Sequence, residues 1–129
     1  MGIGNFFGMM PDSMKESRLY GVELDSITGR IAKQLYPQAD VQIKGFEKTD
    51  YPNDFFDVAI GNVPFGQYKV ADKQYDKNNF LIHDYFIAKT LDKVRPGGVA
   101  ALSQAREPWI RQVRRSEDTL HKEQICLVL

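Results

Sequence analysis

The chain is poor in the residues that form disulfides and metal sites. Among its 129 residues there is one cysteine, Cys126, and there are two histidines, His83 and His121. A single cysteine excludes an internal disulfide and suits a reducing compartment, so we expect a cytoplasmic protein. Because no second histidine or cysteine lies at ligand spacing from His83, the sequence predicts no metal site.

Net charge and long apolar runs are also missing. Seventeen basic residues balance seventeen acidic ones, so the whole chain exerts no electrostatic pull on DNA. There is no signal peptide, no internal repeat and no apolar run of membrane length, and we expect no membrane partner. The length is enough for one domain with a single core.

What the chain does have is an alternation of short apolar runs and helical patterns, which is typical of an α/β fold. The strand candidates are residues 17–25, 41–46, 55–60 and 99–102. Helical spacing covers 27–36 and 80–94, and Asp25 is expected to start or cap the first helix. The expected apolar stripes of the two helices are Ile27, Ile31 and Leu35, and Leu81, Tyr85, Ala88 and Leu91.

The most informative segment is Gly61-Asn62-Val63-Pro64-Phe65-Gly66, directly after the strand candidate 55–60. It places an amide, a main-chain carbonyl and an aromatic ring where a strand meets its loop, and ligands bind at that edge of open α/β sheets. The alternative interpretation is a plain Asn-x-Pro turn with Phe65 in the core. Residues 67–79, which are polar and contain tyrosines, are expected to form a loop over the mouth of the site.

This segment resembles the Asn-Pro-Pro-Phe/Tyr motif of amino-methyltransferases that use S-adenosylmethionine, with Val63 in place of the first proline. The resemblance implies catalytic roles for four residues. The Asn62 side chain and the Val63 carbonyl would accept hydrogen bonds from the target amine, Pro64 would fix the turn, and Phe65 would stack on the base. With residues 21–25, 80–86 and 94–98, the sequence from Gly2 to about Leu102 is similar to adenine-specific (N6) DNA methyltransferases of phage and mobile elements.

The resemblance also implies a Rossmann-like methyltransferase core, S-adenosylmethionine as cofactor and DNA as partner. Gly2, Gly4 and Asn5 would belong to the glycine-rich loop beside the methionine part of the cofactor, where glycine tolerates positive φ. Glu23 would accept hydrogen bonds from both ribose hydroxyls. Phe46 and Glu47 would contact the adenine, although a core phenylalanine beside a surface glutamate is the alternative.

The N-terminal end departs from that family, because its first strand is missing ahead of Gly2. In the family this strand is central, in the order 3-2-1-4-5. The predicted core is therefore incomplete, with two strand pairs and exposed edges between them. We expect a weakly stable monomer, self-association, or a second chain that completes the sheet.

The tail, residues 103–129, departs as well, because the apolar alternation stops there. A shifted reading frame across residues 102–111 can encode the string Val-Thr-Ser-Lys-Gly-Thr-Met-Asp-Lys, with which the family continues. We hypothesise that the tail is out of frame; an ordinary amphipathic tail is the alternative. The sequence thus predicts a partial methyltransferase domain over 1–102, with little activity of its own. An RNA or protein-glutamine methyltransferase fragment and a non-catalytic remnant are the alternative functions.

Overall fold

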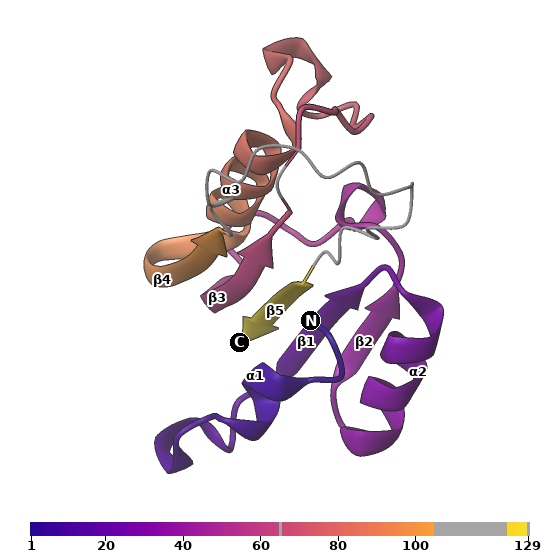
Figure 1. The fold of residues 1–129 in the computed structure, drawn as a ribbon. Coiled ribbons are helices and arrows are strands. Elements are labelled where there is room, and N and C mark those ends of the chain that lie inside the picture. The colour runs from indigo at the N-terminus through magenta and orange to yellow at the C-terminus, as the bar shows by residue number, and fades with distance from the viewer. Residues whose placement is uncertain (65, 105–123, 129) are drawn as a thin grey trace, which may run out of the picture.

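The computed structural model describes residues 1–64, 66–104 and 124–128, which form one five-stranded sheet with helices on both faces (Figure 1). The strands are β1 (Leu19–Glu23), β2 (Asp40–Ile43), β3 (Phe56–Val63), β4 (Val94–Gln104) and β5 (Gln124–Val128). The α-helices are α1 (Asn5–Gly8), α2 (Ser26–Leu35) and α3 (Ile82–Lys93). Short 3-10 turns cover Asp12–Met14, Phe46–Lys48 and Asp76–Asn78. None of the described helices is long and apolar enough to cross a membrane.

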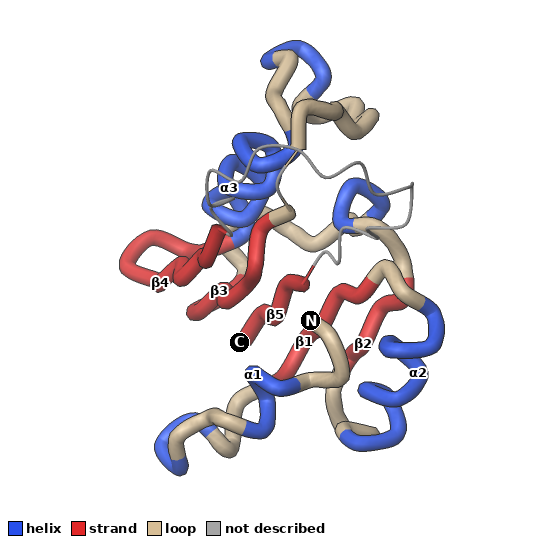
Figure 2. The backbone as a smooth tube through the Cα atoms, in the orientation of Figure 1, coloured by secondary structure: helices blue, strands red, loops and turns tan. Residues whose placement is uncertain are grey.

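The order of the strands across the sheet is β2-β1-β5-β3-β4 (Figure 2). β1 pairs in parallel with β2, and β3 pairs in parallel with β4. β5 lies between these two pairs and runs antiparallel to both of its neighbours. The expectation of exposed edges between two separate strand pairs is therefore wrong, because a strand from the tail fills that gap.

The tail thus contributes a central strand. Within the tail, residues 124–128 form this strand. Residues 105–123, which include Trp109, lie outside the described residues. The reading-frame hypothesis stays a prediction, since only the nucleotide sequence tests it.

The strands β3 and β4 are longer than predicted. β3 continues through Gly61, Asn62 and Val63, so half of the informative segment is extended strand rather than loop. β4 begins at Val94, five residues before the predicted start at Val99, and so includes residues 95–98. The pairing steps from Phe56 opposite Val94 to Val58 opposite Val99, so the additional residues of β4 form an irregularity in the ladder.

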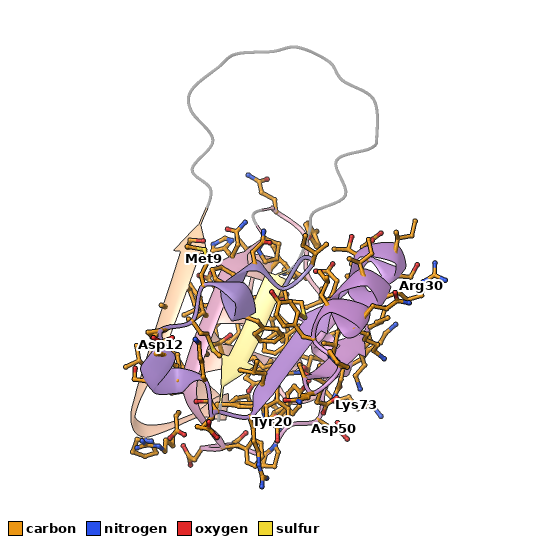
Figure 3. All side chains as sticks on the ribbon, turned by 90° about the horizontal axis from the view of Figure 1, so that it is seen from below. Met9, Asp12, Tyr20, Arg30, Asp50 and Lys73 are labelled. Carbon is orange, nitrogen blue, oxygen red and sulfur yellow. The ribbon has the colours of Figure 1, made fainter. Side chains whose placement is uncertain are left out.

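Helix α2 packs on the sheet through its smallest residues. Gly29 and Ala32 are its buried positions, and a Cβ at Gly29 would lie 2.8 Å from Cγ1 of Ile43 in β2. The predicted stripe faces outward instead: the exposed fractions are 62% for Ile27, 44% for Ile31 and 57% for Leu35. Figure 3 shows Arg30 projecting from the same helix away from the sheet. Asp25 caps α2 as predicted, since its Oδ1 accepts hydrogen bonds from the Thr28 N–H (2.7 Å) and hydroxyl (2.6 Å).

Helix α3 covers the other face of the sheet over a core rich in aromatic rings. The Phe86 ring of α3 contacts the Phe46 ring, with 5.1 Å between the ring centroids. Phe56 and Tyr51 belong to the same core. The predicted stripe is right for Tyr85 but wrong for Leu91, which is 55% exposed. The buried positions of α3 are Ile82, Tyr85, Phe86, Lys89, Thr90 and Lys93. Two lysines thus take positions expected of apolar residues.

Candidate functional site

The carboxyl ends of the four parallel strands lie at one edge of the sheet, where open α/β folds bind ligands. Glu23 ends β1, and Asn62 lies one residue before the end of β3. Both residues pair in register with Gln124 of β5. The backbones of Glu23 and Asn62 are therefore two strand spacings apart, about 10 Å. The fold thus brings one predicted cofactor residue and one predicted catalytic residue to the same edge.

Glu23 is almost fully enclosed, with 1% of its surface exposed. Its Oε2 accepts hydrogen bonds from the Gly2 N–H (2.7 Å) and the Met1 ammonium (3.0 Å). Its Oε1 accepts a third hydrogen bond from the Asp25 N–H (3.0 Å). These hydrogen bonds therefore connect the glycine-rich segment to the end of β1. The N–H groups occupy the positions where the ribose hydroxyls were predicted to bind.

The glycine-rich segment has the backbone that its sequence suggests. Gly2 has φ 62° and Gly4 has φ 95°, values in the left-handed region that favours glycine. A Cβ at Gly4 would also lie 2.5 Å from Cε2 of Tyr36, so the segment passes close to the chain that follows α2. Asn5 is exposed at the first position of α1.

The predicted adenine contacts do not lie at an open surface. Phe46 is fully buried in the core, where its ring lies near Phe86 and Tyr85. The prediction that Phe46 contacts a cofactor is therefore wrong, and the alternative of a core phenylalanine holds. Glu47 is half-buried in the 3-10 turn that follows β2.

The predicted catalytic segment is tied into the sheet. The Ser103 hydroxyl of β4 donates to Asn62 Oδ1 (3.2 Å) and to the Gly61 carbonyl (3.4 Å). Val63 is buried and pairs with Gln104, and Pro64 is buried behind it. Phe65 lies outside the described residues. The Asn62 side-chain oxygen, which was predicted to accept a hydrogen bond from a substrate, thus accepts one from the Ser103 hydroxyl.

A second group of polar side chains, which the sequence interpretation missed, lies beneath the loop of residues 67–79. The Lys89 Nζ donates to Asp72 Oδ2 (2.9 Å) and to the main-chain oxygen of Thr49 (3.2 Å). The Tyr85 hydroxyl donates to the same Asp72 oxygen at 2.6 Å. We call Asp72, Tyr85 and Lys89 the Asp72 cluster. It joins the predicted loop to α3 and to the chain that follows β2.

Burial and hydrogen bonds together set the pKa values of this cluster. Burial by itself raises the pKa of Asp72, but the hydrogen bonds from Tyr85 and Lys89 outweigh it and hold that pKa below its ordinary value. Burial and then the bond to Asp72 raise the pKa of Tyr85. Burial also lowers the pKa of Lys93, one turn further along α3, and the charge of Lys89 adds to this effect. The cluster therefore holds an ionised aspartate against a neutral tyrosine.

The sequence contained one signal for this cluster. Lys89 lies seven residues after Ile82, four after Tyr85 and three after Phe86, which is the spacing of one helix face. A lysine on the apolar face of a helix needs a buried acceptor, but nothing local identifies Asp72, which lies 17 residues earlier.

Two cavities lie away from the predicted site. One of about 440 Å³ lies at the amino ends of β1 and β2, between Lys15, Arg18, Tyr20, Gln38 and Asp40. A smaller one of about 80 Å³ lies under the loop, between Tyr75, Phe80 and Tyr85. None of the predicted site residues that the structure describes lines either cavity. Within residues 1–64, 66–104 and 124–128, no three His, Cys, Asp or Glu side chains form a group that could hold a metal ion.

The chain is similar in sequence to a known phage protein. Over 81 residues the chain is 42% identical to the "Defense against restriction protein B" of Escherichia phage P1. This alignment covers 59% of the chain but only 4% of the phage protein. No protein-family model and no solved structure matches the chain.

This similarity corrects the predicted family and function. The phage protein is named for defence against restriction and not for methyl transfer. The prediction of an adenine-N6 DNA methyltransferase, with DNA methylation as its activity, is therefore wrong.

Proposed function

We propose that this chain is an adenosyl-binding α/β domain that holds S-adenosylmethionine at the carboxyl edge of its sheet. It serves there as part of a protein that defends a phage against restriction. The name of the similar phage protein motivates the second half of this proposal. Since the chain spans about 4% of that protein's length, it represents at most one element of such a defence.

The observation that carries the binding proposal is the position of the Glu23 carboxylate. It is buried at the carboxyl end of β1, where it accepts a hydrogen bond from Gly2, a glycine with positive φ. A carboxylate offers about four acceptor positions, and here three donors approach it. Two neighbouring ribose hydroxyls are a donor pair of the same kind, so an adenosyl ligand that displaces the Met1 and Gly2 donors supplies the same hydrogen bonds with its sugar.

The arrangement of the sheet supports this proposal. Parallel β1, β2, β3 and β4 place their carboxyl ends on one side, and crevices at such ends bind nucleosides in open α/β sheets. Assignment to the Rossmann-like class belongs to this proposal. The half-buried Glu47 lies in the 3-10 turn that follows the carboxyl end of β2, and it is proposed to provide a further polar contact. The cytoplasm is the proposed compartment, because a single cysteine suits it.

Calorimetric titration of the purified chain with S-adenosylmethionine tests the proposal. We expect a dissociation constant in the micromolar range and a loss of at least about tenfold in affinity for Glu23→Gln, since hydrogen bonds to a charged group contribute about 1.5–3 kcal/mol each. Glu16→Gln, at an exposed position, is the matched control and leaves affinity unchanged. Absence of binding by a protein that melts cooperatively would refute the proposal.

Competing ligands and DNA make the test specific. Adenosine should compete with S-adenosylmethionine, whereas methionine alone should not, because Glu23 is proposed to hold the sugar.

DNA is the proposed macromolecular partner. Fluorescence anisotropy with a labelled duplex, at low and at moderate salt, tests it, and an unchanged signal at both would remove DNA from the proposal.

A further inference from the structure

We propose that the space between β1 and β3, here called the central slot, binds β5 from a second copy of this chain, so that two copies exchange this strand and form a dimer. The proposal does not depend on adenosyl binding. It rests on how β5 is paired and on how it is connected to β4.

The central slot has two pairing edges and one strand between them. Along β1 the pairs run from Leu19 opposite Val128 to Glu23 opposite Gln124. Along β3 they run from Val58 opposite Val128 to Asn62 opposite Gln124. Every residue of β5 is thus paired on both sides, while β1 and β3 share no pairing with each other. Without β5 each half of the sheet presents an unpaired edge, which recruits another strand.

The connection to β5 is longer than the path that it has to cover. Gln104 pairs with Val63 and Gln124 pairs with Asn62, so the two ends of the connection lie on either side of β3. They are about 10 Å apart, because each is one strand spacing away from β3. Residues 105–123 separate them in sequence, and a segment of about 19 residues can span roughly 60 Å. The same strand can therefore reach the slot of a neighbouring copy.

The residues of β5 suit exchange between copies. The segment Gln124-Ile125-Cys126-Leu127-Val128 is mainly apolar and contains no proline that would interrupt a ladder. Main-chain pairing is the same whether the strand belongs to one copy or to the other. Exchange of an identical element is therefore a low-cost route to a dimer, and protein concentration selects between the two forms. The second copy is the occupant that fits best, because it supplies the strand with the same register.

Exchange also has a consequence for the candidate site. Gln124 is the residue between Glu23 and Asn62 at the carboxyl edge. In the exchanged dimer this position is filled from the partner copy, so each copy completes the edge of the other.

A disulfide formed with the native cysteine tests the proposal. Ile60 and Cys126 are directly opposite each other in an antiparallel pair. Opposite residues in such a pair have Cα atoms about 4.5–5.5 Å apart, within the range that a disulfide bridges. The full-length Ile60→Cys variant would be refolded under reducing conditions at low and at high concentration, oxidised, and run on a non-reducing gel. Exchange predicts a covalent dimer whose fraction rises with refolding concentration, and peptide mapping should show the bond between positions 60 and 126.

The other outcomes decide against exchange. If oxidation gives only a monomer with an internal disulfide at every concentration, β5 stays in its own chain and the proposal fails. If no bond to Cys126 forms in a folded protein, β5 does not occupy the slot at all. Ile87→Cys, at an exposed position of α3, is the matched control and should form no such dimer. Should Ile60→Cys fail to fold, the opposite pair Val58→Cys and Val128→Cys, combined with Cys126→Ser, repeats the test.

Discussion

Helices α2 and α3 pack on opposite faces of the sheet and bury opposite kinds of side chain. α2 buries a glycine and an alanine, while the aliphatic Ile27, Ile31 and Leu35 are exposed. α3 buries Lys89 and Lys93, with Lys89 near the rings of Phe46 and Tyr85, while Leu91 is exposed. Hydropathy alone therefore does not determine which helix face meets the sheet.

The difference follows from what each helix contacts. α2 lies so close to β2 that Ile43 leaves no room for a side chain at Gly29. α3 lies against main-chain oxygens and the Asp72 carboxylate, which give Lys89 acceptors, and the Lys89 ammonium lies 5.1 Å from the centre of the Phe46 ring. On one face of the sheet, small residues let α2 pack close to β2. On the other face, buried hydrogen-bond acceptors stabilise a charged lysine of α3.

The largest expected effect is on the α3 side. Phe86 is fully buried between Phe46 and Tyr85, so Phe86→Ala should lower the free energy of unfolding by about 3–5 kcal/mol. Ile87→Ala, one residue along the same helix but 38% exposed, should cost less than about 1 kcal/mol. Urea denaturation followed by circular dichroism measures both. Equal losses of stability in the two variants would mean that α3 does not bury the helix face that carries Phe86.

The Asp72 cluster should give the next largest effect. Asp72→Asn leaves the Lys89 ammonium buried without its anion, and removing one partner of a buried pair costs about 3–5 kcal/mol. Since 11% of the Asp72 side chain is exposed, we expect a loss near the lower end, about 3 kcal/mol. Asp50→Asn, at an exposed position, is the matched control and should be nearly neutral.

Acid should remove most of this difference. The folded state holds the pKa of Asp72 below its ordinary value, so its stabilising contribution is complete above that ordinary value, about 3.9. The contribution is lost as the pH falls through the lowered folded-state pKa. Urea denaturation at pH 7 and at decreasing pH below 4 should therefore show the gap between the native chain and Asp72→Asn becoming smaller. A gap that stays constant would show that lost packing, and not lost charge, destabilises the variant.

Sequence patterns predicted local features of this fold better than distant pairings. The cap at Asp25 and the bend of the glycine-rich segment depend on neighbouring residues, and both are present. Glu23 and Asn62 could be placed at one edge because each lies at or near the end of an apolar run. The pairing of Asp72 with Lys89 and the entry of β5 between β1 and β3 depend on contacts between distant segments, which no local pattern encodes.

The smallest effect is expected at the exposed stripe of α2. Ile31 is 44% exposed, and alanine favours helix slightly more than isoleucine, so Ile31→Ala should change the free energy of unfolding by less than about 0.5 kcal/mol. Gly29→Ala is the informative comparison on the same helix. Alanine normally stabilises a helix interior by up to about 1 kcal/mol relative to glycine, but here the added Cβ meets Ile43, and we expect a loss instead. If Ile31→Ala cost more than Gly29→Ala, the apolar stripe would be the packed face of α2, and the contrast between the two helices would be lost.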